Sequence, residues 1–104
     1  KEYDGAKLIV GVLPSLRADA LRELASELIE KENVIALLTS PKEEGGYLTL
    51  FARSASVSCD VGKLLKAASQ MCGGKGGGKS DFAQGSAPVD AVPQAGENIL
   101  LGKI

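Results

Sequence analysis

The residues with the clearest potential for chemistry lie in one stretch, 72–85, which reads CGGKGGGKSDFAQG. Five of the 13 glycines of the chain fall between Gly73 and Gly78, and Lys75 and Lys79 stand among them. Glycine loses more backbone entropy on folding than any other residue, so such a run is expected where unusual backbone angles or a close approach require it. Peptide N–H groups in a tight loop form a concave nest for phosphate, and lysine supplies the charge. The stretch therefore predicts an anion-binding loop, with a flexible linker as the alternative.

The same letters also fit the phosphate-loop pattern of nucleotide-binding proteins. Gly73, four residues, and then Gly78-Lys79-Ser80 match G-x-x-x-x-G-K-[ST], which has meaning only between a buried strand and a helix. Here an amphipathic helix is predicted before the loop, and residues 81–88 are too short and too interrupted to form a helix after it. No apolar strand ends in an aspartate that would hold magnesium. We therefore do not expect nucleotide hydrolysis.

Composition argues against catalysis by this chain. It contains no histidine, which removes the usual general base of hydrolases and the commonest metal ligand. Cys59 and Cys72 are too far apart for a Cys-x-x-Cys pair and have no histidine partners, so they read as buried, reduced thiols rather than zinc ligands. We expect no catalytic residue, no metal site and no cofactor in this domain.

Length and composition indicate the size, class and location of the protein. The 104 residues, with 44% hydrophobic and 24% charged, suit one globular domain with a single modest core. No run is long enough for a membrane helix and no signal-peptide pattern opens the chain, so a cytoplasmic location without membrane contact is expected. The chain begins at Lys1 and stops at Ile104 just after an apolar run, which suggests a piece of a longer protein.

The first half of the sequence predicts two parallel strands joined by a helix. Residues 7–13 form an apolar run that Pro14 stops, and residues 34–39 form a second one. Between them, capped by Ser15 or Asp19 and ended at Asn33, a helix buries one stripe of apolar residues. The stripe consists of Leu21, Leu24, Ala25, Leu28 and Ile29. After the polar turn 41–46, residues 47–53 form a third strand, paired as a hairpin with the second.

The second half predicts a further helix directly before the glycine stretch. Asp60 caps this helix and Gly73 ends it, and its buried stripe consists of Val61, Leu64, Leu65, Ala68 and Cys72. Residues 82–84 form a short strand, whereas after Pro88 only residues 98–101 suggest a terminal helix. The fold class is thus α/β (α+β), a single small mixed sheet of about four strands packed with two to three helices. The leucines expected in its core are Leu24, Leu28, Leu37, Leu50, Leu64 and Leu65.

Charge is distributed unevenly, although the net charge is only −1. Lys63, Lys66, Lys75 and Lys79 gather in the helix and glycine stretch, a modest electrostatic footprint for a phosphate backbone, with solvated lysines as the alternative. Aromatic residues make up 4% of the chain, too few for a base-stacking platform. Nucleic acid would therefore be read through its shape and backbone. Lys31 and Lys42 are expected away from the stretch, and Arg53 is expected as a surface residue rather than an anion contact.

Residues 72–85 resemble the glycine-rich signature in the globular part of the C-terminal domain of alanyl-tRNA synthetase. This domain type also accompanies the DHH phosphoesterases, and the predicted order of elements matches it over nearly the whole chain. The phosphoesterase branch resembles Gly-Gly-Gly-His, in which the histidine helps to hold the scissile phosphate. This chain has Lys79 at that place and no Asp-His-His motif, so the synthetase branch is favoured.

The resemblance implies an accessory domain that binds alanine-specific tRNA at the outer corner of the L and helps to join aminoacylation to editing. It further implies contacts with other domains of the parent enzyme and a possible homodimer, with ATP, Mg²⁺ and Zn²⁺ bound only in upstream domains. The alternative is the substrate-binding domain of a DHH phosphoesterase acting on short nucleic acids or nucleotides. One departure is the segment after Pro88, which reads as broken where the family has a regular terminal helix.

Eleven residues are expected to contact the nucleic acid. They are Gly73, Gly74, Lys75, Gly76, Gly77, Gly78, Lys79, Ser80, Gln84, Lys63 and Lys66.

Overall fold

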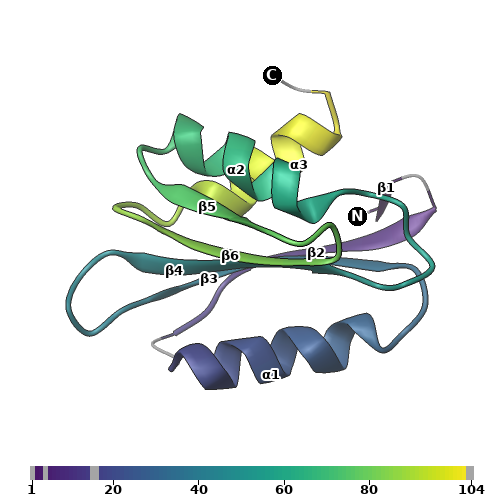
Figure 1. The fold of residues 1–104 in the computed structure, drawn as a ribbon, viewed down its shortest axis with the longest axis horizontal. Coiled ribbons are helices and arrows are strands. Elements are labelled where there is room, and N and C mark those ends of the chain that lie inside the picture. The colour runs from purple at the N-terminus through teal and green to yellow at the C-terminus, as the bar shows by residue number, and fades with distance from the viewer. Residues whose placement is uncertain (1, 4, 15–16, 103–104) are drawn as a thin grey trace.

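One mixed β-sheet separates the helices into two layers in the computed structural model, which describes residues 2–3, 5–14 and 17–102 (Figure 1). The strands are β1 (Glu2–Tyr3), β2 (Ala6–Val12), β3 (Val34–Pro41), β4 (Tyr47–Arg53), β5 (Lys75–Gly78) and β6 (Phe82–Ala87). The helices are α1 (Ala18–Ile29), α2 (Val61–Met71) and α3 (Val92–Leu100). None of the helices in this part of the chain is long and apolar enough to cross a membrane.

The sheet has the order β1-β2-β3-β4-β6-β5. Strands β2 and β3 are parallel, as predicted from the helix between them, and β3 and β4 form the predicted antiparallel hairpin. Strand β6 pairs with β4, and β5 pairs with β6 at the edge, both antiparallel. The α/β class with a single mixed sheet is confirmed. The sheet has six strands rather than about four, because the glycine run and residues 2–3 also pair as strands.

Helix α1 covers one face of the sheet over β3 and β4 (Figure 1). Its apolar stripe packs on residues that alternate along these strands, because successive side chains of a strand point to opposite faces. The buried members of this layer are Leu21, Ala25, Ala36, Leu38, Leu50 and Ala52. Leu24 and Leu28, predicted as core, are only half-buried at the rim of this layer.

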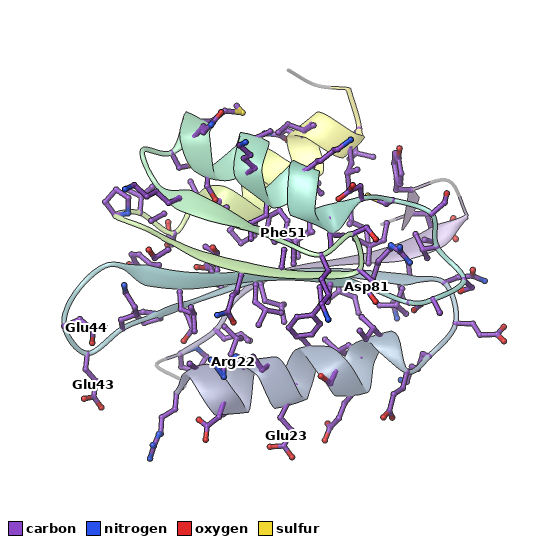
Figure 2. All side chains as sticks on the ribbon, in the orientation of Figure 1. Arg22, Glu23, Glu43, Glu44, Phe51 and Asp81 are labelled. Atoms are coloured by element: carbon purple, nitrogen blue, oxygen red, sulfur yellow. The ribbon has the colours of Figure 1, made fainter. Side chains whose placement is uncertain are left out.

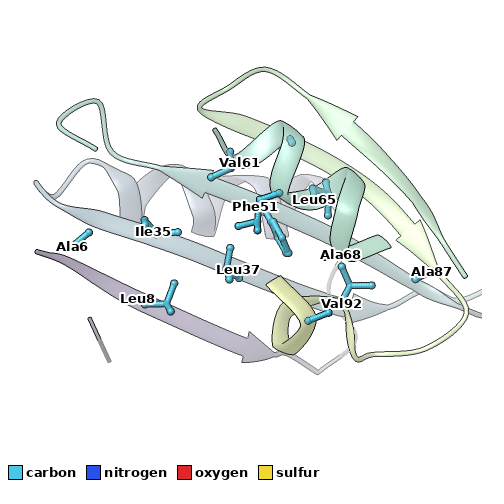
Figure 3. Close-up of a cluster of buried hydrophobic side chains, with 13 residues drawn as sticks. Ala6, Leu8, Ile35, Leu37, Phe51, Val61, Leu65, Ala68, Ala87 and Val92 are labelled. Atoms are coloured by element: carbon cyan, nitrogen blue, oxygen red, sulfur yellow. The ribbon is translucent and has the colours of Figure 1, made fainter. Parts of the chain in front are cut away.

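Helices α2 and α3 pack side by side on the opposite face. Phe51 lies fully buried beneath them with Leu37 and Leu65 (Figure 3), and Leu64 is also buried as predicted. Asp60 accepts a hydrogen bond from the Lys63 N–H (3.0 Å), which confirms the predicted cap of α2. The prediction of Asp19 as the N-cap of α1 is wrong, because Asp19 lies within the first turn of the helix and Arg17 is the N-cap residue. Ser15, the other candidate, lies outside the described residues.

The prediction for the C-terminal segment is wrong, because α3 is a regular helix of nine residues. Pro93 lies in its first turn, where a missing N–H costs no hydrogen bond. Gly96 allows the helix to approach the core closely, since a Cβ atom there would lie 2.8 Å from the ring of Phe51. Pro93 is thus tolerated because it lies in the first turn, and Gly96 is needed because Phe51 packs against the helix there.

Candidate nucleic-acid interface

The glycine run forms an edge strand, so the predictions of a loop and of a flexible linker are both wrong. Residues 75–78 pair with 83–86 of β6, and the Lys79 N–H donates to the carbonyl of Phe82 (3.1 Å) across a tight turn. Before the strand, Gly73 ends α2 with φ +75°, as predicted, and the Gly74 N–H donates to the carbonyl of Ser69 (2.7 Å). The glycines are therefore held in place by the hydrogen bonds of a hairpin and a helix cap.

Most glycines of the run are required by close packing, which is a common reason for glycine inside a strand. A Cβ atom on Gly76 would lie 2.9 Å from Cγ of Leu65 on α2. On Gly78 it would lie 2.8 Å from the Cα atom of Ala83, and on Gly74 it would overlap the carbonyl oxygen of Ser86. The helix above and the strand beside β5 therefore leave no space for side chains at these positions.

Gly77 is the exception within the strand. A Cβ atom there would meet nothing within 4 Å, and its φ is outside the left-handed range. Because side chains alternate along a strand, Gly77 faces away from α2, on the side of the sheet that carries α1. Helix α1 lies over β3 and β4, so this part of the sheet is left open. At Gly77 a molecule outside the fold can reach bare peptide backbone.

The predicted basic residues are exposed but divide between two places. Lys75 and Lys79 flank Gly77 at two-residue spacing, and Gln84 lies opposite Gly77 on β6. Lys63 and Lys66 lie on the exposed face of α2, above the other side of the sheet. Exposed Ser80 occupies the turn after β5. The structure thus brings together the residues of the β5–β6 hairpin, while the two helix lysines form a separate group.

Three basic residues near the hairpin were missed or misjudged from sequence. Arg22 of α1 donates from Nε to Oε1 of Gln84 (3.0 Å), although 62 residues separate them in the chain. Lys42, expected elsewhere, lines a shallow pocket of about 270 Å³ together with Lys75. Arg53 donates to the carbonyl of Ser80 (3.1 Å) at the turn of the hairpin. The sequence contained no signal for these contacts, since each depends on how the strands and α1 assemble.

Arg22 of α1 contacts the open strands through its hydrogen bond to Gln84. Arg22 extends toward the sheet, whereas Glu23 points away from it into solvent (Figure 2). Glu43 and Glu44 lie at the tip of the β3–β4 turn, and Asp81 lies at the opposite end of the sheet. Lys75, Lys79 and Arg22 thus border the sheet face at Gly77, while Asp81 belongs to the turn of the hairpin, two residues from Lys79.

The two thiols have surroundings that suit inert residues. Burial raises the pKa of Cys59, and Asp60 adds to this rise while the Arg53 charge opposes it. Burial also raises the pKa of Cys72. Within the described ranges 2–3, 5–14 and 17–102, no group of three or more cysteine, aspartate or glutamate side chains could hold a metal ion. Protonated thiols are weak nucleophiles and weak metal ligands.

Comparison with known proteins identifies the domain type. The family model described as the DHHA1 domain matches residues 5–100. An alanine–tRNA ligase of Dehalococcoides mccartyi is 36% identical over 88 residues, covering 82% of this chain and 10% of the ligase. One from Psychrobacter cryohalolentis is 30% identical over 98 residues, covering 92% and 11%. The chain therefore spans about a tenth of the length of these relatives.

A solved structure shares the fold. The C-Ala domain from Aquifex aeolicus alanyl-tRNA synthetase superimposes with a TM-score of 0.83 and 21% sequence identity. The match covers 97% of this chain and 94% of that domain.

Proposed function

The chain belongs to the DHHA1 domain family, and from this membership we propose that it is a tRNA-binding accessory domain of an alanyl-tRNA synthetase. The ligases named above, of which it matches about a tenth, support this parent enzyme. Alanine-specific tRNA is the ligand that we propose, with the outer corner of the L as the region contacted. Aminoacylation, editing, and the ATP, Mg²⁺ and Zn²⁺ that they require belong to other domains of the parent.

One observation supports the hairpin as the tRNA contact. At Gly77, unlike Gly76 and Gly78, the packing of the domain would leave room for a side chain, so packing does not explain the glycine. Lys75 and Lys79 stand on either side of it, both exposed. A phosphate that approaches the bare backbone at Gly77 would therefore have a cation on each side. Contacts of this kind fix a protein on the nucleic acid without reading base sequence, as befits a domain that recognises tRNA shape.

If the tRNA lies at the hairpin, the other residues predicted to contact it differ in their distance from it. Gln84 and Ser80 border the same hairpin, whereas Lys63 and Lys66 would reach the tRNA only if it also extends over α2. Partners within the parent enzyme, and a homodimer, remain proposals that rest on the family. A phosphoesterase role is less well supported, since Lys79 replaces the histidine of that branch and the relatives named above are ligases.

Binding to a defined RNA tests this function. An in vitro transcript of alanine tRNA is titrated with the 104-residue chain, and an unstructured RNA of equal length and charge serves as the control. We expect the folded tRNA to bind at least tenfold more tightly than the control, whose dissociation constant should lie in the non-specific range of about 10⁻⁴–10⁻⁶ M. Equal affinity for both RNAs would reduce the proposed function to diffuse charge attraction.

A further inference from the structure

We infer that Arg53 is a positioning residue, which holds the turn that presents Lys79 to the nucleic acid. This inference rests on the proposed function. Arg53 is the last residue of β4 and is half-buried. Its Nε donates to the carbonyl of Ser80 (3.1 Å), and Nη1 donates to the carbonyl of Ser54 (3.1 Å). Nη2 lies 3.4 Å from Oγ of Ser80. The guanidinium therefore bridges the end of β4 and the turn of the β5–β6 hairpin.

Two further contacts hold the same turn. The backbone N–H of Arg53 donates to the carbonyl of Asp81 (3.0 Å), and the Val61 N–H at the start of α2 donates to the carbonyl of Ser80 (2.9 Å). The Ser80 carbonyl thus accepts from both a helix N-terminus and the guanidinium. Two lone pairs are available on a carbonyl oxygen, so both bonds can form together. The turn is fixed to β4 on one side and to α2 on the other.

Lys79 is attached to this fixed turn but is itself free to reach outward. Its backbone N–H bonds to the carbonyl of Phe82 (3.1 Å), while its side chain is exposed. A lysine on a mobile turn would lose conformational entropy when it contacts a phosphate, and holding the turn in advance lowers that cost. Arg53 suits the holding role because its planar fork bonds several acceptors at once, whereas an ammonium group acts as a point donor.

A double-mutant cycle separates positioning from direct contact. The variants are Arg53→Gln, Lys79→Ala and the two together, measured against the alanine tRNA transcript at temperatures well below the melting point of every variant. We expect each single change to weaken binding about fivefold, roughly the effect of one lost phosphate contact. In the Lys79→Ala background, Arg53→Gln should weaken binding less than twofold, because the residue that it positions is already gone.

Other outcomes overturn the inference in distinguishable ways. If the two losses multiply, Arg53 contacts the RNA by itself. If Arg53→Gln leaves affinity unchanged while Lys79→Ala weakens it, the turn needs no such support and the proposed function stands. If neither Lys79→Ala nor Lys75→Ala has an effect, the proposed contact at the hairpin fails. Arg53→Lys repeats the cycle should the glutamine variant not fold.

Hydrogen exchange gives a readout that does not depend on RNA. We expect the Lys79 and Val61 amides, both bonded around the turn, to exchange at least tenfold faster in Arg53→Gln than in the parent chain. Lys7→Gln is the matched control, since Lys7 is an exposed cation of β2 with three strands between it and β5. Unchanged exchange at both amides in the Arg53 variant would contradict the inference.

Discussion

The Cα atom of Gly62 lies against the backbone of Gly78, so closely that a Cβ atom on Gly62 would be 2.7 Å from the Gly78 carbonyl oxygen. This contact joins the first turn of α2 to the end of β5, directly before Lys79. Backbone atoms cannot move aside as the tip of a side chain can. The position of the hairpin therefore depends on the absence of a single methyl group.

Replacement of Gly62 by alanine should separate α2 from β5. Since both neighbouring atoms belong to backbone, we expect a loss of about 1–3 kcal/mol in the free energy of unfolding, despite the better helix propensity of alanine. Urea denaturation measures this loss. Gly11→Ala on β2 is the control, because a Cβ there would lie at an ordinary 3.7 Å from the Leu38 side chain. A Gly62→Ala variant as stable as the Gly11→Ala variant would contradict the packing described.

Gly76 and Gly77 should respond in opposite ways to valine. At Gly76 the new side chain would collide with Leu65 and Ser69, so we expect Gly76→Val to unfold or strongly destabilise the domain. At Gly77 there is open space, and valine favours strands, so stability should change by less than about 0.5 kcal/mol. Because the structure leaves open space at Gly77, we expect valine there to affect binding and not stability.

The effect of Gly77→Val on RNA binding shows whether this glycine contributes to binding. Gly77→Val should melt like the parent chain yet bind the tRNA transcript at least fivefold more weakly, because the side chain covers the backbone that a phosphate would approach. Thermal melts and a binding titration of the same preparation measure both. Full retention of affinity would leave Gly77 without any role in binding.

Arg22 should contribute to binding although it lies outside the glycine stretch. Its guanidinium already bonds Gln84 on the open face of the sheet, so a phosphate there would lie within its reach. We expect Arg22→Gln to lower the salt dependence of tRNA binding by about one contact and to leave the melting temperature within a few degrees. Lys7→Gln should change neither. Identical salt dependence in the two variants would place the RNA elsewhere.

The two layers of the core should differ in their tolerance of truncation. Leu65 is fully buried beneath α2, and we expect Leu65→Ala to cost about 2–5 kcal/mol. Leu24 is half-buried at the edge of the α1 layer, so Leu24→Ala should cost less than about 2 kcal/mol. Denaturant titrations of the two variants, read against the parent chain, test this order, and equal costs would contradict the burial described.

Much of the fold could be predicted because apolar periodicity is strong in residues 7–72. The strand 47–53 was predicted with its true bounds, and Asp60 was correctly predicted as the cap of α2. Strand β5 could not be predicted in the same way, since a run of glycines has no alternation of apolar and polar side chains. Its strand character comes from β6 and α2, which pack against it from outside.

The candidate site was predictable only in part for a related reason. Residues 72–85 were predicted as a site because their composition is unusual. In the sequence, Arg22 and Lys42 cannot be distinguished from other charged surface residues. Their approach to the hairpin follows from the strand order, which places β6 next to β4 and β5 at the edge, beyond the strands over which α1 lies. Contacts between residues so distant in the chain can be recognised only in the folded structure.

Salt dependence of tRNA binding, measured for the parent chain and for Lys75→Ala, Lys79→Ala and Lys7→Ala, tests the central claim most directly. Binding of the alanine tRNA transcript would be followed between about 50 and 200 mM salt, where the slope counts the phosphates neutralised. We predict that Lys75→Ala and Lys79→Ala each lower the slope by about one contact, whereas Lys7→Ala leaves it unchanged. Equal slopes for all four proteins would contradict the hairpin as the tRNA-binding surface.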